Sequence, residues 1–129
     1  MEMIGFRVWD NHKRIIRNVT SISFNRNGLI TQVTYFNNGV RCSVKKCFSL
    51  LQYIGKEDKE GNPVFDGYYI EYQDVIYKVS FYKTLSIFAL FYDLGCVSVG
   101  FIDWSKAKIV GNVYENFSLD KKCGFYSHK

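Results

Sequence analysis

Dense turn signals between short runs of β-branched and aromatic residues constrain this chain more than any other feature of its sequence. Residues 25–28 read Asn-Arg-Asn-Gly and residues 37–39 read Asn-Asn-Gly. Asparagine and glycine are the residues that most readily adopt the positive φ of tight turns. The run 15–24 before the first turn is rich in Ile, Val, Thr and Ser, and the run 29–36 after it returns as a second strand-like segment. We therefore predict a β-hairpin over residues 15–36, followed by a third short strand over 40–44.

The same alternation of strand-like runs and turns continues toward the C-terminus. Residues 68–72 and 75–81 are predicted strands around a tight turn at Gln73-Asp74, and residues 109–114 are the last predicted strand. Several short strands at close spacing indicate a small barrel or sandwich, so the chain is predicted to be mostly β with little helix.

Between these strands lie two further segments, for which we predict different structures. Residues 45–53 suit a strand, which we favour, although Phe48, Leu51 and Gln52 also match the spacing of one or two helical turns. Residues 55–63 contain only polar residues, glycine and proline. They are therefore predicted to be an exposed turn.

The length of 129 residues predicts a single domain over 1–129, with a front subregion over 1–50 and a second over 51–129. With 47% apolar residues, the chain can bury a core without a metal or a disulfide. Its four cysteines show no paired ligand spacing, so we expect no metal site and free, buried thiols. These cysteines are Cys42, Cys47, Cys96 and Cys123.

The start of the chain and one apolar stretch bear on its location. Residues 1–7 lack the charged and apolar regions of a signal peptide, so we expect a cytoplasmic protein. Residues 85–102 are almost wholly apolar, but Asp93 lies near their centre. A charge there is costly in a membrane, so we predict two buried strands joined at Asp93-Leu94-Gly95 and no membrane span.

The charge is distributed unevenly along the chain. Residues 1–56 carry nine basic and two acidic residues, a net charge of +7, whereas residues 57–129 have a net charge of −2. Such asymmetry indicates either a basic face for an anionic partner or two parts of one chain that attract each other. The candidates for nucleic-acid contact are the basic residues of the front part, Lys13, Arg14, Arg17, Arg41, Lys45 and Lys46, with Arg26 nearby.

No residue pattern indicates an enzyme or a cofactor site. The two histidines are His12, in a polar loop, and His128, next to the last residue. General acid–base and nucleophilic catalysis need a positioned, desolvated group, which such histidines do not supply. We therefore expect a non-enzymatic binding or assembly module with no catalytic residue, metal or cofactor. Its partner would be an unknown protein, a further copy of the chain or a nucleic acid.

Tyrosines crowd one predicted hairpin, and they have two readings. They are Tyr68, Tyr69, Tyr72, Tyr77 and Tyr82. Tyrosines on a small β domain can stack nucleic-acid bases or hold a peptide. We favour the simpler reading, in which half of them belong to the core and the others cover its edge.

Three segments of the chain carry distinctive motifs: residues 6–10 (FRVWD), residues 51–67 (LQYIGKEDKEGNPVFDG) and residues 110–116 (VGNVYEN). Taken together, they resemble the YopX family of phage and prophage proteins. The first is similar to the family's opening motif and the third to its closing motif, while the second is the longest and most specific likeness. The residues of these motifs are read as fold-specifying: Trp9, Tyr53, Gly55, Gly61, Gly67, Gly111, Asn112 and Tyr114.

The resemblance implies a fold and an origin but no activity. It implies an SH3-like β barrel in the C-terminal half, with an appended N-terminal β-hairpin region, and a phage or mobile-element source.

An isolated hairpin is marginally stable in water, so the front hairpin is expected to bury one face. We expect that face to contain Ile22, Phe24, Val33 and Tyr35, with Trp9 fastened beside them.

Overall fold

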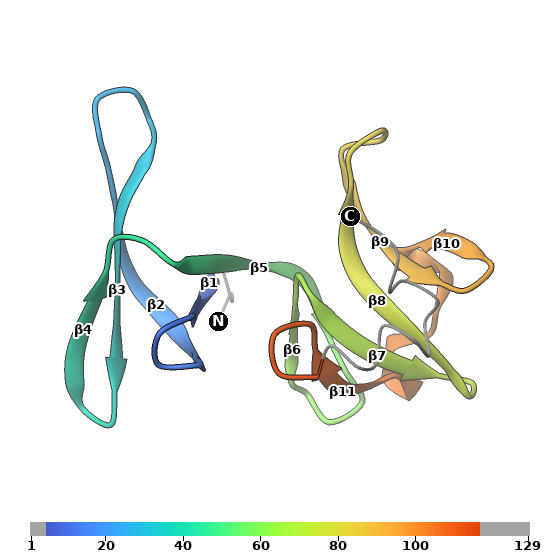
Figure 1. Cartoon of the computed structure of the whole chain (residues 1–129). Helices are drawn as coiled ribbons and strands as arrows, with labels where there is room; N and C mark the ends of the chain where they lie inside the picture. The colour runs from blue at the N-terminus through green and yellow to red at the C-terminus, as the bar shows by residue number, and fades with distance from the viewer. Residues whose placement is uncertain (1–4, 117–129) are drawn as a thin grey trace. The chain divides into compact units, whose positions relative to one another are not determined.

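The computed structural model describes residues 5–116, and within them most of the regular secondary structure is β-strand (Figure 1). It divides into two compact units, Met1–Tyr53 and Ile54–Lys129, with the boundary inside a strand. Two short 3-10 helices, η1 (Val99–Phe101) and η2 (Trp104–Lys106), are the helical elements of the described residues. No described helix has the length and apolar character needed to cross a membrane.

The first unit is a meander of four strands with the start of a fifth. The strands are β1 (Phe6–Asp10), β2 (Ile15–Phe24), β3 (Ile30–Asn37), β4 (Val40–Val44) and β5 (Phe48–Glu57). The order across the sheet is β4-β3-β2-β1-β5, and β6 (Pro63–Phe65) follows β5. The predicted hairpin over 15–36 is therefore confirmed, but it is not an isolated pair, since β1 and β4 flank it.

One face of this sheet carries the core of the first unit. Val8, Val33 and Tyr35 are fully buried there. Six partly buried side chains pack against them: Ile15, Val19, Cys42, Val44, Phe48 and Leu50. The expectation that Val33 and Tyr35 are buried is confirmed, whereas Ile22 is only partly buried. Trp9 is buried too, but it directly follows Val8 in β1 and therefore lies on the opposite face of the sheet, not beside them.

Phe24 was wrongly expected in this buried face. It is 59% exposed. The register between β2 and β3 shifts between Ser23 and Phe24, and such a shift breaks the simple alternation of faces on which the expectation rested. Figure 1 shows a second reason for the exposure at this end of the sheet, since the β2–β3 hairpin projects beyond the ends of β1 and β4.

The second unit contains a sheet of five strands in the order β10-β9-β8-β7-β11. They are β7 (Tyr68–Tyr72), β8 (Val75–Tyr82), β9 (Ile87–Tyr92), β10 (Gly95–Ser98) and β11 (Lys108–Asn112). Tyr69 is at the centre of a cluster completed by Ile76, Phe91, Val110 and Val113. Among the described residues the pairings form an open sheet, and the closed SH3-like barrel that the resemblance implies is not seen.

The predicted turns fall where the strands end, with one correction. The strands over residues 87–92 and 95–98 confirm the reading of the apolar stretch as two strands. Of these two, only β9 contains buried residues, Ala89 and Leu90, so the expected burial of the second strand is wrong: β10 lies at the edge of its sheet. By contrast, the segment 55–63 is not one exposed loop. β5 continues to Glu57 and β6 begins at Pro63, and Asp58 between them is buried.

Candidate functional site

The buried carboxylate of Asp10 organises the turn between β1 and β2. Its Oδ1 accepts hydrogen bonds from the backbone N–H groups of His12 (3.0 Å) and Lys13 (3.3 Å), and its Oδ2 accepts one from the Tyr35 hydroxyl (2.5 Å). Burial raises the pKa of Asp10, but these hydrogen bonds outweigh it and hold the pKa below its usual value. Burial and the neighbouring carboxylate raise the pKa of Tyr35. The pair is therefore a neutral hydroxyl bonded to a carboxylate, which closes the turn.

Asp58 has the same role between β5 and β6. Its Oδ1 accepts from the N–H groups of Glu60 (3.0 Å) and Asn62 (2.9 Å), and its Oδ2 accepts from that of Ile109 (3.1 Å) at the start of β11. Burial raises the pKa of Asp58, but the three N–H donors outweigh this effect and lower it. The carboxylate therefore joins the turn to a strand that lies 51 residues away in the chain.

Asn112 closes the chain turn that follows β11. Its Oδ1 accepts from the N–H groups of Tyr114 (3.0 Å) and Glu115 (2.9 Å), while its Nδ2 donates to the Glu115 carboxylate (2.8 Å). The neighbouring Gly111 has no room for a side chain, since a Cβ there would lie 2.8 Å from the Asn116 Oδ1. Asn112 and Gly111 therefore both shape the turn that follows β11.

The other motif residues lie in strands and turns. Gly55, Gly61 and Gly67 all adopt positive φ (86°, 81° and 87°), which disfavours any side chain there. The Tyr53 N–H donates to the Gly5 carbonyl (3.1 Å). The Trp9 indole N–H donates to the Asn11 side chain (3.3 Å). These backbone conformations and hydrogen bonds hold turns and strands of the chain in place.

The basic residues of the first unit do not gather on one face. Register places Arg17 opposite Val8, on the side of the sheet that carries the core. Its guanidinium is occupied by Asn37 Oδ1 (3.1 and 2.9 Å) and by the Ile16 carbonyl (2.8 Å). Lys13 reaches the same side, where its Nζ lies 3.1 Å from the Cys42 Sγ.

The remaining cations lie elsewhere. The Arg14 guanidinium stacks over the Trp9 ring at 5.3 Å. Arg41 is exposed in β4, and Lys45 and Lys46 are exposed in the bend after it. The six predicted nucleic-acid residues are thus divided between the core face, the β1–β2 turn and the β4 region.

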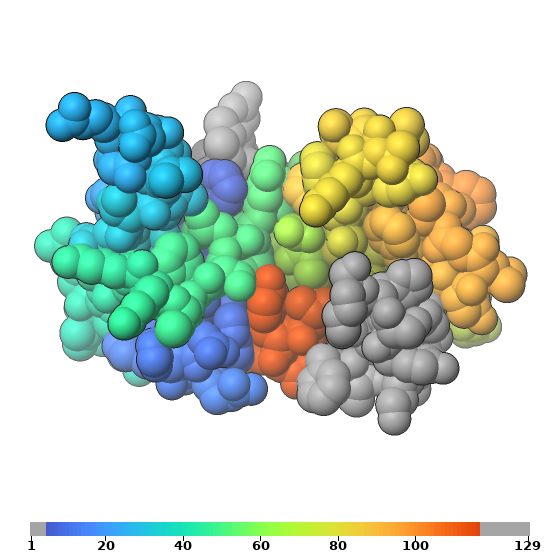
Figure 2. All heavy atoms as spheres, turned by 45° about the horizontal axis from the view of Figure 1, so that its top comes forward, coloured from blue at the N-terminus to red at the C-terminus, as the bar shows by residue number. Residues whose placement is uncertain are grey.

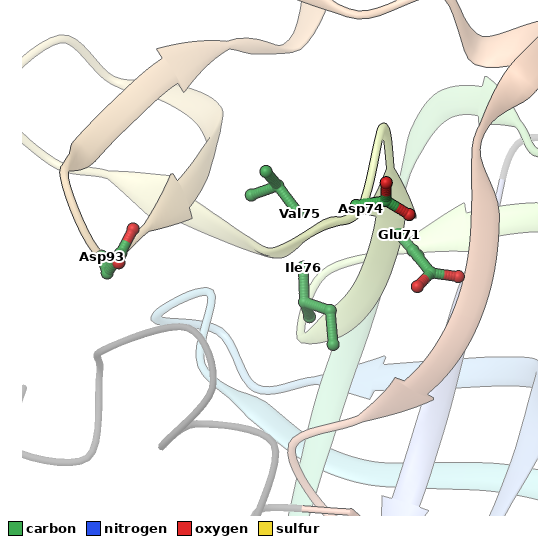
Figure 3. Close-up of a pocket in the computed structure, with 5 residues that line it drawn as sticks. All are labelled: Glu71, Asp74, Val75, Ile76 and Asp93. Carbon is green, nitrogen blue, oxygen red and sulfur yellow. The ribbon is translucent and has the colours of Figure 1, made fainter.

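A shallow hollow in the second unit is acidic. It has a volume of about 360 Å³ and is lined by Glu71, Asp74, Val75, Ile76 and Asp93. Figure 3 shows Asp93 across the hollow from Glu71 and Asp74. Within residues 5–116, no group of three or more His, Cys, Asp or Glu side chains is arranged to hold a metal ion.

Cysteine exposure was predicted wrongly. Cys47 and Cys96 are exposed and Cys42 is partly buried, and all three are free. Cys47 lies in the bend before β5 and Cys96 in the edge strand β10, where few neighbours cover a side chain. Cys123 and His128 lie outside the described residues.

Of the five crowded tyrosines, Tyr68, Tyr69 and Tyr77 are buried, and Tyr72 and Tyr82 are partly exposed. The reading of this set as part core and part edge is therefore confirmed.

The burial of the carboxylates of Asp10 and Asp58 was not predicted from the sequence, because polar residues in turns are usually exposed. An aspartate followed within two to four residues by turn residues was the available signal.

A family model for the YopX protein matches residues 5–119. This chain belongs to the YopX family. Among curated proteins, no match was found.

Two solved structures share the fold of this YopX family member. Protein EF1440 from Enterococcus faecalis superposes with a TM-score of 0.63 at 17% identity, over 92% of this chain and 99% of that one. Protein yopX from Bacillus subtilis gives a TM-score of 0.62 at 18% identity, over 89% of this chain and 96% of that one. At such identities the likeness establishes the fold alone.

Proposed function

We propose that this chain is a phage- or prophage-encoded binding or assembly module without catalytic activity, which acts in the cytoplasm of the bacterial host. The observation that carries the proposal is the use of the buried carboxylates. Asp10 and Asp58 accept hydrogen bonds at both oxygens from N–H or O–H groups of their own chain. Carboxylates engaged in this way serve the fold and are poorly placed to transfer protons to a substrate.

Four other carboxyl groups of the second unit add support to the proposal. Burial raises the pKa of the half-buried Asp66, with a smaller opposing effect from the Gly67 N–H. General acid–base catalysis usually pairs a carboxyl group of raised pKa with a second titratable group, so that one donates a proton and the other accepts one. Glu71, Asp74 and Asp93 line an open hollow and are all exposed, so they keep the solvation of ordinary surface carboxylates.

Exposed apolar side chains supply surface for a partner. Phe24, Leu29 and Ile30 lie at the end of the β2–β3 hairpin, with 59%, 63% and 40% of their surface exposed. Leu85 and Ile87 occupy the corresponding end of the β8–β9 hairpin. Clustered exposed apolar residues are typical of interaction surfaces.

A turnover screen combined with photo-crosslinking tests this proposal. The full chain is incubated with panels of ester, phosphoester, glycoside and peptide substrates, and a photo-crosslinking residue is placed at Leu29 or, as a control, at Lys59. We expect no product, and a defined crosslinked partner in host cells at position 29 but not at the control position 59. Reproducible turnover that a single substitution abolishes would contradict the proposal.

A second candidate is nucleic-acid association through the first unit, and one observation favours it. Asp10 is the only carboxylate within residues 5–53, and it is buried, whereas the same residues carry eight cations. A salt titration with DNA and RNA oligonucleotides tests this candidate, because phosphate contacts strengthen as salt falls. Absence of binding even at low salt would remove it.

A further inference from the structure

The strand β4 ends the sheet of the first unit. Within residues 5–116, β3 is its only partner strand, and β4 contains no proline. Figure 1 shows β4 next to β3 with no strand on its outer side. An edge strand of this kind presents unpaired N–H and C=O groups that a further strand can join.

The turn before β4 determines which backbone groups face outward. Asn38 and Gly39 both adopt positive φ (52° and 80°), the pattern of a two-residue type I′ turn. Asn37 and Val40 are register partners next to this turn, and in such hairpins the closing pair exchanges hydrogen bonds. The alternation along the ladder then directs the N–H and C=O of Arg41 and Ser43 away from β3.

Positive charge surrounds this open edge. Arg41, Lys45 and Lys46 are all exposed, and they fall within six consecutive residues. Figure 2 shows the β4–β5 region, coloured turquoise to green, at the surface. The only carboxylate of residues 5–53, Asp10, is buried, so no exposed carboxylate of this part of the chain neutralises these cations.

The open edge and its cations favour an acidic peptide over a second copy of the chain or a nucleic-acid duplex. A second copy pairing through its own β4 would bring like charges together, which disfavours that pairing. A nucleic-acid duplex requires many cations on one surface, whereas Arg17 is occupied and lies on the opposite face from Arg41. An acidic peptide that pairs with β4 as a strand requires only the cations along this edge.

We propose that the outer edge of β4 binds an acidic, extended peptide segment of a partner protein, which adds to the sheet as a further strand. The backbone groups of Arg41 and Ser43 supply the hydrogen bonds. The side chains of Arg41, Lys45 and Lys46 select acidic residues. This inference rests on the proposed function as a binding module and names the partner class.

Substitution of Ser43 by proline tests the strand pairing. Proline removes the outward N–H, whereas Ser43→Ala removes only the hydroxyl that contacts Thr34 Oγ1 (3.2 Å). The probe is a labelled synthetic peptide that alternates glutamate with threonine, and its control carries glutamine in place of glutamate. We expect Ser43→Pro to weaken binding of the acidic peptide about tenfold, equivalent to about 1.4 kcal/mol, and Ser43→Ala to leave it unchanged.

A charge series tests the selectivity. The triple variant Arg41→Gln, Lys45→Gln, Lys46→Gln is compared with a matched variant of exposed lysines in the second unit, Lys59→Gln, Lys83→Gln, Lys106→Gln. Only the first is expected to lose its preference for the acidic peptide over the glutamine peptide. Thermal unfolding of every variant establishes that it is folded.

Any of four results would overturn the inference: equal binding by Ser43→Pro and Ser43→Ala, no preference for the acidic peptide, a dimer that Ser43→Pro dissociates, or an oligonucleotide that binds in place of the peptide. None of these results involves turnover, so failure here is distinguishable from failure of the proposed function.

Discussion

Loss of the Asp58 carboxylate should be among the most damaging single changes to the second unit. The side chain is 5% exposed and accepts three backbone N–H groups. Each buried N–H left without a partner costs about 1–3 kcal/mol. Because water can reach part of the space left by a truncated side chain, we expect Asp58→Ala to lower the free energy of unfolding by about 3–5 kcal/mol.

Asp58→Asn provides an intermediate step. The amide oxygen can keep the bonds from Glu60 and Asn62, but the amide nitrogen then faces the Ile109 N–H, donor against donor. We expect this variant to lose about 1–3 kcal/mol, from one lost bond and the lost charge. Stability should therefore fall in the order wild type, Asp58→Asn, Asp58→Ala.

Urea unfolding followed by circular dichroism at neutral pH measures these differences. Glu60→Gln is the matched control, since it removes one carboxylate charge from the same turn but its side chain is exposed. It should unfold close to the wild-type midpoint. If Asp58→Ala were as stable as Glu60→Gln, the assignment of Asp58 as the link between the β5–β6 turn and β11 would be refuted.

Three further predictions follow from single features. Trp9→Ala should cost about 3–5 kcal/mol, because the ring is 5% exposed; a variant that melts at the wild-type temperature would make Trp9 a surface residue. Gln73→Asn combined with Asp74→Gly should raise the free energy of unfolding by about 1 kcal/mol, since both residues hold positive φ (52° and 65°), and an unchanged melting temperature would count against this. The depressed pKa values of Asp10 and Asp58 stabilise the fold above the usual value of 3.8, so the urea midpoint should fall as the pH drops below about 4. The fall should be shallower in Asp58→Asn, and equal slopes would contradict the assignment.

Local chemistry was enough to predict the hairpins. The Asn-Asn-Gly segment supplies residues that tolerate positive φ, and the strand runs on either side alternate apolar and polar residues, so turn and strand signals agreed. The strand over residues 6–10 was not predicted, because it is short and buries three consecutive residues, Val8, Trp9 and Asp10. A strand buried on both faces does not show the alternation that identifies strands from sequence.

Interactions between distant residues were beyond local reasoning. Asp58 is in a segment composed like an exposed loop, and it is buried only because Ile109 brings a donor to it from 51 residues away. Phe24 was placed on the wrong face because a register shift is a property of two strands together. The open edge of β4 depends on the order of strands in the sheet, which composition and spacing do not determine.

The central claim is that this chain works by binding, at β4, without changing what it binds. A titration of the isotope-labelled full chain with the acidic peptide, followed by nuclear magnetic resonance of the backbone amides, tests this most directly. The account predicts saturable shifts and slowed hydrogen exchange at the amides of Arg41 and Ser43, together with peptide that is recovered intact. Unshifted amides along β4, or a peptide recovered in altered form, would contradict it.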